Sequence, residues 1–123
     1  MSTMVYVAGP YSAATAEGVN QNIAYAKKVA QYLWHEGYAV ICPHMNSAHM
    51  EGSNSGHMSF KKAFKMYLVG DFEMISRCDA VVMLPGWEDS KGSCAEFVFA
   101  HWLGIPVFHW PFIDGIWKVG KDE

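Results

Sequence analysis

The sequence lacks the features typical of membrane proteins, secreted proteins and proteins that bind duplex nucleic acid. Its longest hydrophobic runs are far shorter than the roughly 20 residues that a membrane-spanning helix needs. Its first residues contain neither the basic region nor the apolar run of a signal peptide. Lys and Arg together number 9 against 12 for Asp and Glu, so the basic footprint of a duplex-binding protein is missing. We therefore expect neither a membrane nor a nucleic acid polymer as a partner.

Cysteine is scarce, and the common cofactor motifs are absent. The three cysteines form no C-x-x-C pair, and their odd number favours reduced thiols and a cytoplasmic location. Neither a P-loop nor a complete G-x-G-x-x-G occurs, so ATP and dinucleotide sites of those kinds have no support. His44, His49 and His57 share one loop, but their separations of five and eight match no known metal site. We expect no metal and no organic cofactor.

The remaining pattern is that of one globular domain spanning residues 1–123, with 51% hydrophobic residues. Apolar runs predict strands over residues 4–8, 38–42, 80–84 and 105–109. Helical spacing of apolar residues predicts helices over residues 17–36, 60–77 and 93–103. Strands that are apolar throughout and alternate with helices are typical of a parallel sheet covered on both faces. The sequence therefore predicts an α/β fold with four or five parallel strands between helices.

Three polar loops are expected at one edge of this sheet, over residues 9–17, 43–59 and 85–93. In open parallel sheets, ligands bind at the carboxyl ends of the strands. Gly9 and Pro10 form a tight turn that lets a ligand approach the backbone. His44 lies in the long second loop, and a loop of that length in a small domain is usually functional or mobile. Trp87, in the third loop, either stacks on a ligand's ring or packs on the sheet.

Glu96 is the most conspicuous polar residue, because it lies near the start of an otherwise apolar helix. The run Ser93-Cys94-Ala95-Glu96 fits the capping box S-x-x-E, which explains the glutamate without any function. The loop before it also places Ser90, Gly92 and Ser93 at a helix N-terminus, where backbone amides favour an anion. Charge matching would not put a carboxylate beside an anion site, which suggests a chemical task for Glu96. Both interpretations remain open on the sequence.

A second carboxylate, Asp71, occupies a position where an apolar residue is expected. It belongs to a stripe of the second helix, Phe60, Phe64, Tyr67, Asp71 and Ile75. Asp71 either faces water at the edge of the stripe, is satisfied by a backbone amide, or faces the same space as Glu96. In the last case the two carboxylates would shift each other's pKa values. Asp79 is a turn residue, and Tyr6, in the middle of the first strand, is a core residue unless its hydroxyl reaches the ligand edge.

Three segments resemble one known family, the nucleoside 2-deoxyribosyltransferase superfamily. They are VYVAGPYS at 5–12, GDFEMISRCDAVVMLPGW at 70–87 and SKGSCAEFVFAHWLGIPV at 90–107. The likeness is strongest to a small phage and bacterial branch, and it covers nearly the whole chain. It implies a flavodoxin-like three-layer fold, no cofactor, and a homodimer or higher homo-oligomer in which a neighbouring subunit often completes the site.

The resemblance also implies an activity, the cleavage of the base–sugar bond of a nucleoside or its 5′-monophosphate. The family's nucleophile, a glutamate that attacks C1′ and forms a covalent glycosyl-enzyme, maps to Glu96. Its sugar- or base-side aspartate maps to Asp71, and its strand-one tyrosine maps to Tyr6. Water then hydrolyses the intermediate, or a second base accepts the sugar.

One position in the resemblance separates two classes of substrate. Six residues before the glutamate, enzymes acting on free nucleosides have an aspartate, and monophosphate hydrolases have a serine. This chain has Ser90 there, which favours a nucleoside 5′-monophosphate bound near Ser90, Gly92 and Ser93. The alternatives are base exchange between deoxynucleosides, a nucleotide-binding module that does not catalyse, and a structural domain in which Glu96 is only a helix cap.

Overall fold

A four-stranded parallel sheet forms the centre of the molecule. The computed structural model describes residues 3–43 and 60–119. The strands are β1 (Met4–Ala8), β2 (Ala39–Ile41), β3 (Ala80–Met83) and β4 (Val107–His109). Their order is β2-β1-β3-β4, and each neighbouring pair is parallel. Because β1 and β3 are the inner strands, their side chains are the most deeply buried.

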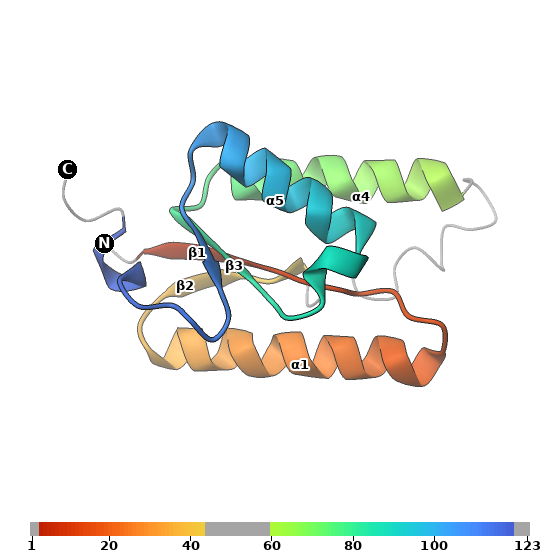
Figure 1. The fold of residues 1–123 in the computed structure, drawn as a ribbon, viewed down its shortest axis with the longest axis horizontal. Helices are drawn as coiled ribbons and strands as arrows, with labels where there is room; N and C mark the ends of the chain where they lie inside the picture. Colours follow the sequence, from red (N-terminus) through yellow and green to blue (C-terminus); the bar gives the residue numbers. More distant parts are fainter. Residues whose placement is uncertain (1–2, 44–59, 120–123) are drawn as a thin grey trace.

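Helices cover both faces of this sheet, as Figure 1 shows. Helix α1 (Ala16–His35) lies along one face, and α4 (Phe60–Ile75) and α5 (Lys91–Leu103) lie side by side on the other. Two short 3-10 turns, η1 (Trp87–Asp89) and η2 (Ile116–Lys118), complete the described elements. The arrangement is the expected flavodoxin-like three-layer α/β fold, with four strands.

Alternate residues of the strands supply two separate hydrophobic clusters. On the α1 side, Val5, Val7 and Val82 pack with Leu33 and with Ile116 of η2. A second cluster forms beneath α4 and α5, and its buried members are Tyr6, Ala8, Ile75, Cys78, Val81, Met83 and Ala100. The polar residue Tyr6 of β1 therefore lies in the layer between the sheet and helices α4 and α5.

The predicted strands and helices are present, and the differences at their ends have local causes. Strand β4 begins at Val107 instead of residue 105, because Ile105 completes the end of α5. The Ile105 amide donates to Ala100 O at 2.9 Å while Gly104 adopts φ +76°, which is a glycine-terminated helix end. The chain after β4 contains one short 3-10 turn, η2.

Asp79 and the three cysteines have structural positions. The Asp79 carboxylate accepts a hydrogen bond from Met4 N at 2.8 Å, and its own amide donates to Met4 O at 2.8 Å. These two hydrogen bonds hold the start of β1 beside the start of β3. They agree with the prediction that Asp79 is a turn residue. In the described part of the chain, none of Cys42, Cys78 and Cys94 is in a disulfide. Over residues 3–43 and 60–119, no helix has the length and hydropathy needed to cross a bilayer.

Candidate active site

The loops after β1 and β3 meet at the carboxyl edge of the sheet. The Leu84 amide donates to Ala8 O at 2.7 Å, so the two strand ends are joined. A Cβ atom on Gly9 would lie 2.6 Å from Leu84 Cβ, so only glycine fits there. Gly86, with φ +90°, would place a Cβ atom 3.4 Å from Pro10 Cγ. The predicted meeting of these two loops is therefore confirmed.

This edge is also where the chain reverses its direction across the sheet. From β1 the chain passes to β2 on one side and later returns to β3 on the other. Such a switch point is the usual ligand site of an open α/β sheet, because the loops after the two inner strands diverge there. His44 and nearly all of the loop over residues 43–59 lie outside the described residues, so their predicted part in binding stays a prediction.

Glu96 is buried in the layer between the sheet and α5. Its side chain is 5% exposed, and Oε2 accepts a hydrogen bond from the Tyr6 hydroxyl at 2.8 Å. Tyr6 itself is completely buried in the middle of β1. Burial, and then the neighbouring Glu96, raise the pKa of Tyr6, so the phenol stays a proton donor to the carboxyl. A buried hydrogen bond therefore joins Tyr6 of β1 to Glu96 of α5.

Asp71 lies beside this pair, on the half-buried face of α4. Of the three positions considered for Asp71, the structure favours the one facing Glu96, because the two carboxyls are close enough to shift each other's pKa. Burial raises the pKa of both groups. A hydrogen bond that protonated Glu96 donates to Asp71, together with the charge of Asp71, raises the pKa of Glu96 further, whereas the same hydrogen bond lowers the pKa of Asp71. Burial and the neighbouring Asp71 therefore both favour the protonated form of Glu96.

The capping-box interpretation of Glu96 is wrong. The N-cap of α5 is Ser90, whose Oγ accepts a hydrogen bond from Ser93 N at 3.2 Å. Ser93 is already the third residue of the helix, so it cannot cap it, and Glu96 bonds to Tyr6. The helix begins at Lys91, two residues before the predicted start, because an extended Ser90 supplies the cap.

The first turn of α5 retains features of an anion site. The amides of Lys91 and Gly92 occupy positions where a helix has no internal acceptor for them. Ser90 Oγ accepts a bond from Ser93 N, and its own O–H is still able to donate. Gly92 lies against the Phe64 ring, with an added Cβ 3.8 Å from Phe64 Cε2. These groups are one to two turns from Glu96 along the same helix.

Trp87 packs against the protein. Its ring stacks on Phe97 with centroids 4.7 Å apart and lies 5.8 Å from the His109 ring. The side chain is half-buried and contacts the cluster beneath α4 and α5. This position fits the interpretation that Trp87 packs on the sheet, and its stacking on a base stays a prediction.

Sequence reasoning missed Ser90 as the helix cap and Leu84 as the neighbour of Gly9. Both serines of S-x-x-S-x-x-E are suitable caps, and the capping-box pattern favoured the second one. Within the described residues, no group of three His, Cys, Asp or Glu side chains is placed to hold a metal ion. The titratable groups that do converge are the Asp71 and Glu96 carboxyls and the Tyr6 phenol.

The fold and this cluster define an α/β protein in which a buried glutamate and a half-buried aspartate meet beside the inner strand β1. The chain belongs to a family described as a domain of unknown function, DUF4406, whose model matches residues 3–109. The match includes every strand, the helices α1, α4 and α5, and all the predicted site residues. A search of curated proteins found no match.

Proposed function

We propose that the protein is an N-glycosidase that cleaves the base–sugar bond of a nucleoside or deoxynucleoside 5′-monophosphate. The observation that supports this most strongly is the buried Glu96 carboxyl, bonded to Tyr6 and within reach of Asp71. A pair of neighbouring carboxyls with raised pKa values, one of them buried, is typical of catalytic groups. The sequence resemblance assigns the same three residues.

The first chemical step is nucleophilic attack at C1′ of the sugar. Glu96 passes its proton to Asp71, and the resulting carboxylate forms a bond to C1′. The C1′–N bond breaks, its electron pair goes to the base, and Asp71 protonates the departing nitrogen. The Tyr6 hydroxyl holds Oε2 of Glu96 throughout, so the attacking oxygen has one orientation. The negative carboxylate also stabilises the oxocarbenium-like transition state, as in retaining glycosidases.

The second step releases the sugar. Asp71, now ionised, takes a proton from a water molecule whose oxygen bonds to C1′. The C1′–O bond to Glu96 breaks, and its electron pair returns to the carboxylate. Exchange with a second base in place of water would give a transferase, which is the alternative that the resemblance leaves open.

The phosphate group binds at the start of α5. The amides of Lys91 and Gly92 and the Ser90 O–H are hydrogen-bond donors at the positive end of the helix dipole. The Lys91 side chain is exposed and adds a positive charge there. A doubly charged phosphate fits such donors, whereas an aspartate at position 90 would repel it.

Release of free base tests this proposal. The wild type, Glu96→Gln and the matched control Glu88→Gln are incubated with each common ribo- and deoxyribonucleoside 5′-monophosphate, and products are separated by chromatography. Glu88 is exposed in η1, so its substitution removes a nearby charge without touching the site. We expect base from the wild type and from Glu88→Gln only. Absence of base at stoichiometric protein, with nucleotide binding retained, would instead identify a nucleotide-binding module.

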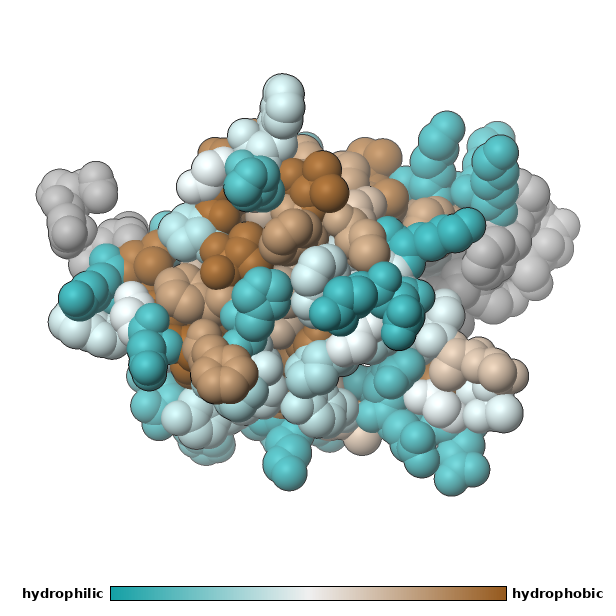
Figure 2. All heavy atoms as spheres, in the orientation of Figure 1, coloured by the Kyte–Doolittle hydropathy of each residue, from teal (hydrophilic) through white to brown (hydrophobic). Residues whose placement is uncertain are grey.

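We also propose that the protein forms a homodimer in the cytoplasm. Hydrophobic side chains gather over α5, as Figure 2 shows, and Val98 and Trp102 of this helix are 61% and 85% exposed. Soluble monomers rarely expose adjacent large apolar side chains. The mass in solution tests this, because Trp102→Lys is expected to give monomers if α5 forms the interface.

A further inference from the structure

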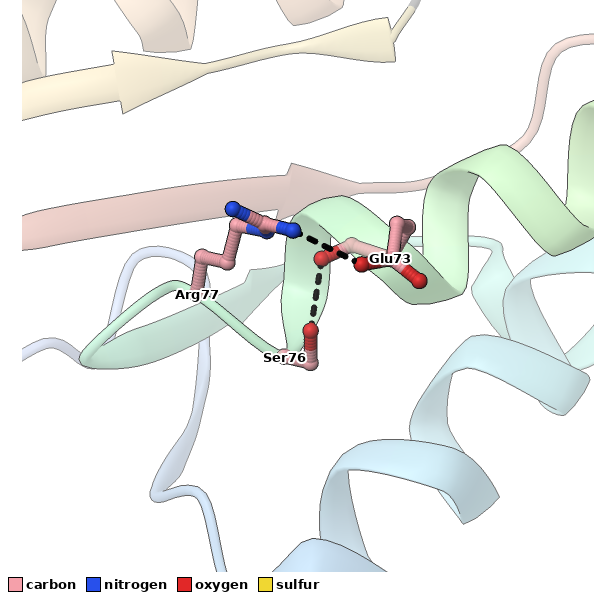
Figure 3. Close-up of polar contacts among 3 residues, drawn as sticks. All are labelled: Glu73, Ser76 and Arg77. Carbon is pink, nitrogen blue, oxygen red and sulfur yellow. Dashed lines mark hydrogen bonds and ion pairs between the residues drawn. The ribbon is translucent and has the colours of Figure 1, made fainter.

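Ser93 has a buried hydroxyl that no other group satisfies. Its side chain is 2% exposed, and Oγ has no hydrogen-bond partner in the described part of the chain. Buried hydroxyls are almost always hydrogen-bonded, so an exception points to a ligand-binding role. By contrast, even the exposed hydroxyl of Ser76 has a hydrogen-bond partner, because it donates to Glu73 O at 2.6 Å (Figure 3).

The position of Ser93 relates it to both ends of the proposed substrate. Ser93 and Glu96 are three residues apart, which corresponds to about 4.5 Å along a helix axis. Both side chains are buried, so they lie on the same face of α5, toward the sheet. Toward the start of the helix, the next residues are Lys91 and Gly92, whose amides form the anion end. Ser93 therefore lies between the candidate nucleophile and the candidate phosphate site.

We infer that the Ser93 hydroxyl hydrogen-bonds a hydroxyl group of the substrate's furanose ring. This inference rests on the proposed function, because C1′ at Glu96 and a phosphate at the first turn of α5 place the ring beside Ser93. A ring hydroxyl and a serine hydroxyl can each donate and accept, so they satisfy one another. Ser93 is then a residue that determines sugar specificity, and Ser90 is the residue that caps the helix and contacts phosphate.

The test compares the wild type, Ser93→Ala and the control Ser76→Ala on three forms of one nucleotide. These are the ribonucleoside 5′-monophosphate and its 2′-deoxy and 3′-deoxy analogues. Losing one neutral hydrogen bond weakens binding by about 2- to 12-fold. We expect the wild type and Ser76→Ala to discriminate by this factor against one of the two analogues. Ser93→Ala should bind the ribonucleotide and that analogue equally.

A second measurement separates a ligand contact from a structural one. Because the Ser93 hydroxyl has no hydrogen-bond partner over residues 3–43 and 60–119, Ser93→Ala should melt at the wild-type temperature or above it. A lower melting temperature, or unchanged discrimination between the nucleotides, would overturn the inference. If the wild type neither binds nor cleaves any of the common nucleoside 5′-monophosphates, the proposed function and this inference are both wrong. Binding with unchanged discrimination overturns only the inference.

Discussion

The Tyr6 hydroxyl donates a 2.8 Å hydrogen bond to Oε2 of Glu96, joining residues 90 positions apart in the chain. One partner is in the middle of the inner strand β1, and the other is in the second turn of α5. Both side chains are buried, so water does not compete for their hydrogen bond. The geometry of the candidate site therefore depends on how α5 packs on the sheet.

Removing the Glu96 charge should stabilise the protein at neutral pH. The pKa of Glu96 is well above its usual range when folded, so folding favours its protonated form. This contribution to the free energy of unfolding is fully present below about pH 4.3, the pKa of a glutamate in an unfolded chain. It is lost as the pH rises through the pKa of Glu96 in the folded protein. Compared with wild type, Glu96→Gln should gain up to about 1.4 kcal/mol of unfolding free energy per pH unit within this window.

Urea denaturation of wild type, Glu96→Gln and the exposed control Glu88→Gln between pH 4 and 8 measures this gain. Glu88→Gln should show little change at any pH. A Glu96→Gln variant less stable by about 1 kcal/mol, the size of a lost cap, would contradict the burial argument.

Replacing the two neighbours of Glu96 should move its pKa in opposite directions. Asp71 raises that pKa through its hydrogen bond and charge, whereas the Tyr6 hydrogen bond lowers it. Asp71→Asn should therefore lower the Glu96 pKa, and Tyr6→Phe should raise it. A carbon-13 NMR titration of the labelled glutamate carboxyl reports both shifts without needing turnover. Shifts of the same sign in the two variants would mean that the carboxyls are not hydrogen-bonded to each other.

Two substitutions of Ser90 should distinguish its role as a helix cap from its role in phosphate binding. Ser90→Ala removes the acceptor for Ser93 N and should lower the unfolding free energy by about 0.5–2 kcal/mol. Ser90→Asp keeps a good cap, so its stability should equal that of wild type, but its charge repels a phosphate. We expect Ser90→Asp to lose most affinity for a nucleoside 5′-monophosphate and to keep its affinity for the free nucleoside. Equal losses for both ligands, measured by calorimetry, would argue against a phosphate site there.

Two glycine-to-alanine substitutions should have opposite effects on stability. Gly9→Ala puts a Cβ atom 2.6 Å from Leu84 Cβ in a buried turn, and such overpacking costs about 1–3 kcal/mol. Gly70→Ala adds a methyl group to exposed space in α4, where nothing lies within 4 Å. Since alanine favours helix more than glycine, this variant should gain about 0.5–1 kcal/mol. Thermal unfolding of the two variants and wild type checks the order, and a Gly9→Ala variant as stable as wild type would refute the close contact.

The order and type of the elements could be predicted from the sequence, because hydrophobic periodicity is a local property of the chain. The apolar run over residues 4–8 predicts a buried strand, and β1 has those bounds. Asp71 and Glu96 could be singled out for a similar reason, since each interrupts an apolar helix face. Local patterns do not say whether such a carboxylate faces water, an amide or another carboxylate.

The tertiary structure decided those contacts, because they depend on which residues are brought together from distant parts of the chain. Ser90 and Ser93 are equally good caps in sequence, and the extended backbone at Ser90 made it the cap. Tyr6 could face either layer, and the register of β1 between β2 and β3 turned its hydroxyl toward α5. The sequence by itself determined the fold class and the candidate carboxylates. Packing of α4 beside α5 on one face of the sheet determined that these carboxylates share one site, since it brings residues of two separate helices together.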